Sequence, residues 1–192
     1  MFRSATLSAT VLIATTAALP ASPRGQSPAL VVSESGPNYA ITASVSQLVL
    51  TIPKQGLVAD KAGTDPMYFS FNDSPHALIV SGWFSPADGF HGIKEFWAAE
   101  SADWQRRTGT PEPSNVAFEQ MGSWNLVFYD FGLRGVTSAN VRAHWVDAGT
   151  WIDVHISKTS DRRLDLRTEL RNVLKSFTVT VKGRFLLDAA GL

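Results

Sequence analysis

Apolar and polar positions alternate over residues 39–52, which is the pattern of β-strands with one buried face. Pro53 ends this stretch, because proline cannot donate to a sheet ladder. A further strand is predicted over 67–71, ahead of a turn at 72–75. The segment 76–84 is almost continuously apolar and therefore predicts an inner strand of a sheet.

The hydrophobic period changes after this inner strand. From Ile93 onward, large apolar residues recur at spacings that fit one face of a helix, which we expect to end near Gly109. Pro111 and Pro113 then predict a loop. Further strands are predicted at 116–120, 124–131, 141–146 and 151–158. One apolar stripe predicts a closing helix, and it consists of Leu166, Leu170, Val173, Leu174 and Phe177.

This order of elements predicts an α+β fold. Strands, a helix, more strands and a second helix follow one another without the strand–helix alternation of a parallel sheet. We therefore expect an antiparallel β-sheet flanked by helices. A chain of 192 residues, 44% of them hydrophobic, can form one domain with a sizeable core. We place this domain at 39–182, followed by a C-terminal tail at 183–192.

Residues 1–21 have the pattern of a secretory signal peptide. Arg3 precedes an uncharged, apolar run from Ala5 to Leu19, and the candidate cleavage sites follow Ala18 and Ala21. No later stretch approaches the ~20 apolar residues of a membrane-spanning helix, so we expect no integral membrane segment after cleavage. The Pro- and Gly-containing segment 22–38 is predicted to be a flexible linker. The protein is therefore expected to be exported, either periplasmic or secreted.

Composition removes several classes of function. The absence of cysteine excludes disulfides, thiolate nucleophiles and cysteine-ligated metals. Seventeen basic and seventeen acidic residues, without a basic cluster, argue against nucleic-acid binding. The sequence contains no phosphate-binding loop, no serine-hydrolase elbow and no H-E-x-x-H motif. We expect no cofactor, and an unidentified protein or small molecule as partner.

Three segments resemble the PsbP-like family: TIPKQGL at 51–57, NVRAHWVDAGTWIDVHISK at 140–158 and LRTELRNVLKSFTVT at 166–180. The resemblance extends over 39–181 in the order of elements. It implies an antiparallel sheet flanked by helices. It also implies an accessory role, since one family member assists the oxygen-evolving centre of photosystem II and a eukaryotic relative binds a small GTPase. It assigns no functional residue to this chain.

A hairpin centred on Ala148–Gly149 is predicted to gather polar side chains on one face. In its register Trp151 opposes Val146, His144 opposes Asp153, and Arg142 opposes His155, with opposed Cβ atoms about 5 Å apart. A hydrogen bond between His144 and Asp153 is therefore expected. The candidate ligand-binding residues are Arg142, His144, Trp151, Asp153 and His155.

Several interpretations of this polar face stay open. It is a paired sheet face with a structural role, a ligand or partner site, or a metal-dependent or acid/base site built from His144, Asp153 and His155. The sequence favours an exported, non-enzymatic binding or accessory protein without a metal, or a structural subunit of an envelope complex. The alternative is an enzyme that uses the same face. A covering helix would make the cluster an internal network, whereas a concave surface would favour ligand binding.

Overall fold

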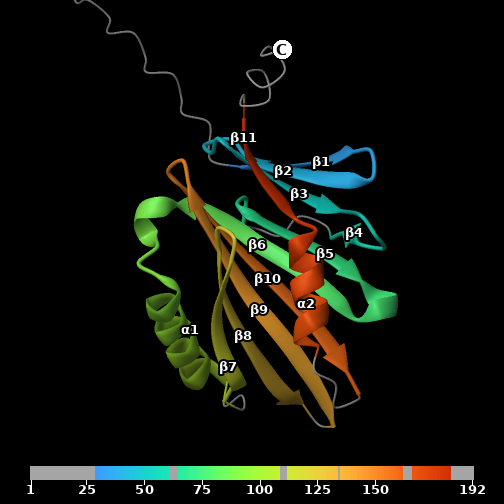
Figure 1. Cartoon of the computed structure of the whole chain (residues 1–192), viewed down its shortest axis with the longest axis vertical. Helices are drawn as coiled ribbons and strands as arrows, with labels where there is room; N and C mark the ends of the chain where they lie inside the picture. The colour runs from blue at the N-terminus through green and yellow to red at the C-terminus, as the bar shows by residue number, and fades with distance from the viewer. Residues whose placement is uncertain (1–28, 61–64, 109–111, 134, 162–165, 183–192) are drawn as a thin grey trace, which may run out of the picture.

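The computed structural model describes residues 29–60, 65–108, 112–133, 135–161 and 166–182. The predicted signal peptide, the segment 22–28 and the predicted tail at 183–192 lie outside these residues. The described chain forms two antiparallel sheets and two α-helices (Figure 1). No helix among the described residues has both the length and the apolar character needed to cross a membrane.

The smaller sheet has four strands in the order β1-β2-β3-β11. Their bounds are Leu30–Ser35, Asn38–Ala43, Leu48–Pro53 and Thr178–Val181. The larger sheet has seven strands in the order β4-β5-β6-β10-β9-β8-β7. In chain order, their bounds are β4 Val58–Ala59, β5 Tyr68–Asp73, β6 Leu78–Pro86, β7 Ser114–Met121, β8 Trp124–Leu133, β9 Val136–Asp147 and β10 Thr150–Ser160.

The two α-helices cover opposite faces of the larger sheet. Helix α1 (Ile93–Thr108) packs on the face that presents Tyr129, and helix α2 (Arg167–Lys175) packs on the face that presents Phe128. Adjacent strand residues point to opposite faces, so the sheet is enclosed by a helix on each side. Two short 3₁₀ turns, Ser74–His76 and Ala87–Gly89, flank β6.

The main core lies between the smaller sheet, α2 and the inner face of the larger sheet. Residues of β2 and β3 alternate between buried and half-buried, as a strand with one buried face requires. Leu170 and Leu174 of α2 are fully buried against the same cluster. The apolar stripe predicted for the closing helix therefore is its core-facing side.

The predicted α+β class and antiparallel pairing are confirmed. The predicted hairpin register is also confirmed, because His144 pairs with Asp153 and Arg142 pairs with His155. The segment 76–84 contributes an inner strand, β6, which lies between β5 and β10. The first predicted helix is α1, and it ends at Thr108.

The structure corrects the prediction of a linker over 22–38 within the part that it describes. Leu30–Ser35 is strand β1, which pairs with β2 along its whole length. Gly36 has φ 55°, and it makes the tight turn between β1 and β2 rather than a flexible connection. The β-branched Val31 and Val32 favour the extended conformation that the strand requires.

Two further elements differ from the expectation. The alternating stretch 39–52 is divided into β2 and β3 by a turn, and the end of the closing helix is followed by β11. β11 pairs with β3, and a short strand with so distant a partner has no local pattern that reveals it.

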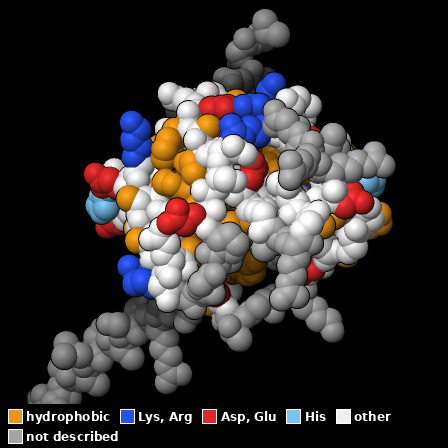
Figure 2. Space-filling model, turned by 90° about the horizontal axis from the view of Figure 1, so that it is seen from below, with side chains coloured by type: hydrophobic (Ala, Val, Ile, Leu, Met, Phe, Trp, Pro, Cys, Tyr) orange, Lys and Arg blue, Asp and Glu red, His pale blue; other side chains and the backbone are white. Residues whose placement is uncertain are grey.

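The lower end of the molecule in Figure 1 carries acidic and basic side chains in a mixed distribution rather than in one broad area of a single sign (Figure 2).

Candidate functional site

The structure brings the five predicted site residues together and covers them with α1. Arg142, His144 and Asp153 are buried, with 8%, 0% and 8% of their surface exposed, and Trp151 and His155 are half-buried. Phe96 of α1 and the preceding Phe90 contact the His144 ring, at centroid distances of 4.2 and 5.3 Å. The residues therefore form an internal polar network, which we call the α1 network.

Arg142 is the centre of the α1 network. Its Nη1 donates to Asp153 Oδ2 at 3.1 Å, and its Nη2 donates to Glu100 Oε1 of α1 at 3.0 Å. The guanidinium also lies 5.6 Å from the ring centroid of Trp83 and 5.8 Å from that of Phe96. One buried cation thus serves two carboxylates and links the helix to the sheet.

The expected hydrogen bond between His144 and Asp153 is not formed. His144 Nε2 lies 3.6 Å from Asp153 Oδ1, which is beyond hydrogen-bond distance. Trp151 Nε1 instead donates to His144 Nδ1 at 2.9 Å, so Nδ1 is the acceptor and the proton resides on Nε2. The hairpin register correctly predicted that His144 lies opposite Asp153, but the Trp151 indole determines which hydrogen bond the imidazole forms.

His155 has a separate set of partners. Its Nε2 lies 3.1 Å from Asn140 Oδ1 and 3.2 Å from the Tyr129 hydroxyl. Asn140 Nδ2 donates to the Ser138 carbonyl at 2.8 Å, so its Oδ1 is the atom that faces the imidazole. His155 therefore donates from Nε2 and takes part in a bonded chain of polar side chains under α1.

Burial controls the ionisation of the α1 network. Burial, together with the charge of Arg142, lowers the pKa of His144 and that of His155 to about 3. Burial raises the pKa of Asp153 to about 6, although the Arg142 charge opposes this shift. Burial also raises the pKa of Tyr129 above its usual range. Both imidazoles are therefore neutral at pH 7.

The ion pairs of Arg142 in the α1 network link helix α1 to the larger sheet. Among the described residues, no group of three His, Cys, Asp or Glu side chains could bind a metal ion. Arg142 occupies one oxygen of Asp153, and Trp151 occupies one nitrogen of His144. Three buried atoms of the α1 network have no hydrogen-bond partner within the described chain: Arg142 Nε, His144 Nε2 and Asp153 Oδ1.

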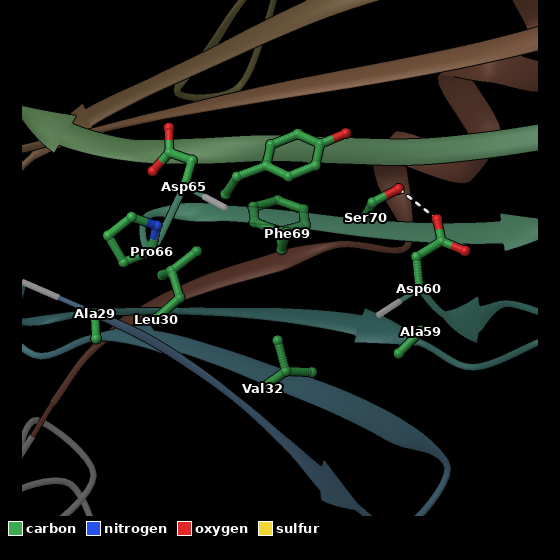
Figure 3. A pocket seen from close by; sticks show the side chains of 10 residues that line it. Ala29, Leu30, Val32, Ala59, Asp60, Asp65, Pro66, Phe69 and Ser70 are labelled. Carbon is green, nitrogen blue, oxygen red and sulfur yellow. Dashed lines mark hydrogen bonds between the residues drawn. The ribbon is translucent and has the colours of Figure 1, made fainter. Parts of the chain in front are cut away.

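A second candidate site is an open cleft between β1 and β5, with a volume of about 400 Å³ (Figure 3). Leu30 and Val32 of β1 point across it toward β5, where Phe69 forms part of the opposite wall. A neighbouring cavity of about 330 Å³ is lined by residues without charge, among them Val45, Met67 and Phe84. We call the first, larger feature the β1–β5 cleft.

Two carboxylates line the β1–β5 cleft, and neighbouring donors hold each in place. Asp60 accepts hydrogen bonds from the Ser70 hydroxyl at 2.6 Å and from the Asn72 amide. Asp65 accepts from the Met67 backbone N–H at 2.8 Å and from Trp83 Nε1 at 3.3 Å. Both aspartates are exposed, and neither forms an ion pair with a cationic side chain of the described chain.

The sequence interpretation missed this cleft. β1 was missed because its residues were predicted to be part of a linker. The polar segment 55–66 shows no alternation of apolar and polar residues that would place Asp60 beside Ser70. The available signal was the apolar start of β1, Leu30-Val31-Val32, followed by a Gly-Pro turn and an alternating strand. That pattern is typical of a hairpin.

Comparison with known proteins identifies the fold. No family model matches the chain, and no curated protein matches it. The solution structure of cyanobacterial PsbP from Synechocystis is similar, with a TM-score of 0.52, 13% sequence identity, and coverage of 84% of this chain and 99% of that chain. The chain therefore has a PsbP-like α+β fold.

Proposed function

We propose that the protein is an exported, non-enzymatic binding or accessory protein, periplasmic or secreted, and that its ligand occupies the β1–β5 cleft. The observation that carries the proposal is the cleft itself: an open space of about 400 Å³ with apolar walls and two fixed, exposed carboxylates. Concave sites that combine apolar walls with a few oriented polar groups are the usual form of a binding site.

The export part of the proposal rests on the leader. Residues 1–21 combine a basic start, an uncharged apolar run and small residues near the cleavage positions. The accessory role implied by the PsbP-like resemblance is compatible with an exported protein. Because identity with the similar structure is 13%, no partner is transferred from it.

The alternative is a metal-dependent or acid/base enzyme that uses Arg142, His144, Asp153 and His155. It has less support, because ring contacts from Phe90 and Phe96 cover His144. Arg142 is also paired with Asp153 and with Glu100 of α1. A substrate would have to displace α1 before it reached these groups. The β1–β5 cleft needs no such rearrangement.

A photo-cross-linking amino acid at Val32 tests the proposal in cells that make the full chain. Val146 is a matched control, because the two positions are 42% and 38% exposed and only Val32 lines the cleft. We expect an adduct on the exported form with the Val32 probe and none with the Val146 probe, measured by intact mass so that protein and small-molecule adducts are both detected. No adduct at Val32, or equal adducts at both positions, would contradict the proposal.

A further inference from the structure

We infer that the β1–β5 cleft receives an extended peptide segment of a partner protein, which carries basic side chains and pairs with the free edge of β1. This inference rests on the proposed binding role of the cleft and names the class of its ligand. It draws on the backbone of β1, the incomplete cover of β5, the regularity of the β1 edge and the charge of the cleft.

The backbone of β1 presents unpaired groups to the cleft. Ser44 N–H donates to the Ala29 carbonyl at 2.9 Å, so these two residues form a hydrogen-bonded pair of the β1–β2 ladder. Since such pairs alternate along antiparallel strands, Leu30, Val32 and Glu34 direct their N–H and C=O groups away from β2. Leu30 N–H donates to the Pro66 carbonyl at 2.8 Å. The outward groups of Val32 and Glu34 have no partner among the described residues.

The opposite wall also contains a backbone acceptor of β5 that has no donor among the described residues. β4 is two residues long and pairs only with Phe71 and Asn72 of β5. Asp60 N–H donates to the Ser70 carbonyl at 2.9 Å, so Ser70 faces the β4 side, and by alternation the Tyr68 carbonyl faces the same side. No N–H of the described chain donates to the Tyr68 carbonyl on this side, and Tyr68 lines the cleft. A strand placed in the cleft thus has backbone partners on β1 and an acceptor on β5.

The first half of the β1 edge, residues 30–32, lacks the charge, proline or bulge that usually protects a sheet edge. Among the described strands, four lie at edges: β1, β11, β4 and β7. β4 and β11 are short, at two and four residues, and β7 has an irregular register between Ser114 and Ala117. β1 has six residues in continuous register, and its Val31 and Val32 are 56% and 42% exposed. Long, regular, apolar edges invite strand addition, so proteins normally block them with charge, proline or bulges.

The charged residues among the described lining of the cleft are Asp60 and Asp65, and they favour a basic partner. Asp60 accepts a hydrogen bond from Ser70 and Asp65 accepts one from Met67. Met67 and Ser70 are three residues apart, which corresponds to about 10 Å in an extended strand. Side chains two positions apart in an added strand lie about 7 Å apart on one face, and the long stems of Lys or Arg span the difference. β1 itself contains Glu34 and no basic residue, so a second copy of β1 would not supply these cations.

An NMR titration of the isotope-labelled exported form tests the inference. The probe is an acetylated, amidated seven-residue peptide in which two lysines alternate with three valines between terminal threonines. We expect the amide signals of Val32 and Glu34 to shift and saturate, since their N–H groups would bond to the peptide. A peptide with proline in place of the central valine, and one with glutamates in place of the lysines, are each expected to bind at least tenfold more weakly.

Matched variants separate the charge effect from a change in the fold. Asp60→Asn and Asp65→Asn are each expected to weaken binding of the lysine peptide about threefold or more. Asp88→Asn, at an exposed aspartate in the 3₁₀ turn Ala87–Gly89, is the control and is expected to leave the affinity unchanged. Each variant is accepted only if its amide spectrum keeps the wild-type dispersion. The lysine peptide is also expected to bind more weakly as salt is raised.

Four results would overturn the inference. The first two are an absence of amide shifts with the lysine peptide and equal affinity for the lysine and proline peptides. The other two are an equal loss of affinity in Asp88→Asn and Asp60→Asn, and amide shifts that are confined to Asp60 and Asp65 and that 1,5-diaminopentane reproduces. The last result would assign the cleft to small cations. A doubled mass without peptide, with Val32 signals broadened, would assign the β1 edge to a second copy. If the cross-linker at Val32 gives an adduct but the lysine peptide does not bind, the peptide inference is wrong and the binding role of the cleft stands. If there is neither an adduct nor peptide binding, both the inference and the proposed binding role are wrong.

Discussion

Arg142 on β9 and Glu100 on α1 form the ion pair that links the helix to the larger sheet, with 3.0 Å between Nη2 and Oε1. The same guanidinium holds Asp153 of β10 at 3.1 Å. Because Arg142 is 8% exposed, both pairs lie where water screens them little. Replacement of Arg142 therefore removes the cation from two carboxylates at once.

Arg142→Met is expected to lower the free energy of unfolding by about 3–5 kcal/mol, the usual effect of removing one partner from a buried ion pair. Urea unfolding followed by tryptophan fluorescence measures the change. Arg106→Met is the control, since Arg106 pairs with Asp103 on the exposed side of α1. An unchanged unfolding midpoint for Arg142→Met would show that the ion pairs do not hold α1 to the sheet.

The folding stability is expected to fall as pH decreases from about 6.5. His144 and His155 have pKa values of about 3 in the folded protein, against 6.5 for the unfolded reference. The unfolded chain therefore binds more protons between these values, so the stability present above pH 6.5 is lost toward pH 3. Asp153 acts in the opposite direction between about 6 and 3.8, and it offsets only part of the effect of two histidines.

His144→Gln tests this pH dependence, because glutamine can still accept from the Trp151 indole but does not titrate. Thermal unfolding from pH 7.5 to 4.5 is expected to show a shallower loss of stability for His144→Gln than for wild type. His91→Gln, at an exposed histidine before α1, is expected to keep the wild-type slope. Identical slopes for all three proteins would mean that His144 does not remain neutral in the folded state.

Gly82 of β6 is expected to tolerate no side chain. A Cβ at this position would lie 2.2 Å from the backbone carbonyl oxygen of Asp153 and 2.7 Å from the Phe69 ring. Gly82→Ala is therefore expected to destabilise the fold by about 3 kcal/mol. Gly132→Ala in β8 is the matched control, since its Cβ would meet nothing within 4 Å. An unfolding midpoint of Gly82→Ala equal to that of the wild type would contradict the close approach of β6 and β10.

The strand edges give a further pair of variants. Val31 directs its N–H toward β2 and Val32 directs its N–H away from β2, as the ladder alternation requires. Val31→Pro is expected to lose a ladder hydrogen bond and to lower the unfolding midpoint, whereas Val32→Pro is expected to change it little. Equal losses would mean that the edge assignment of β1 is wrong.

The hairpin could be predicted from the sequence because its evidence is local. A turn at Ala148–Gly149 sets the register, and a period of two separates the polar face from the apolar face. What covers the polar face is decided by α1, which is distant in sequence from the hairpin. The burial of Arg142 and His144 therefore could not be read from the residues around them.

The β1–β5 cleft could not be predicted for a related reason. Its walls come from the two sheets, and Asp60 and Asp65 take their positions from hydrogen bonds to Ser70 and Met67 rather than from any motif. Glycine and proline, as at Gly36 and Pro37, are common both in linkers and in turns. Only the pairing of β1 with β2 resolves that ambiguity in favour of a hairpin.

The most direct test of the cleft as the binding site places the photo-cross-linker at Ala59, an exposed residue on the wall opposite β1, with and without Val32→Pro. The proline removes the outward N–H of β1 and leaves the β1–β2 ladder intact. The cleft assignment predicts an adduct at Ala59 in the wild-type background. The strand-pairing inference predicts that its yield decreases at least fivefold with Val32→Pro, while the unfolding midpoint is unchanged. No adduct at Ala59 would contradict the cleft assignment, and the same yield in both backgrounds would contradict the pairing with β1.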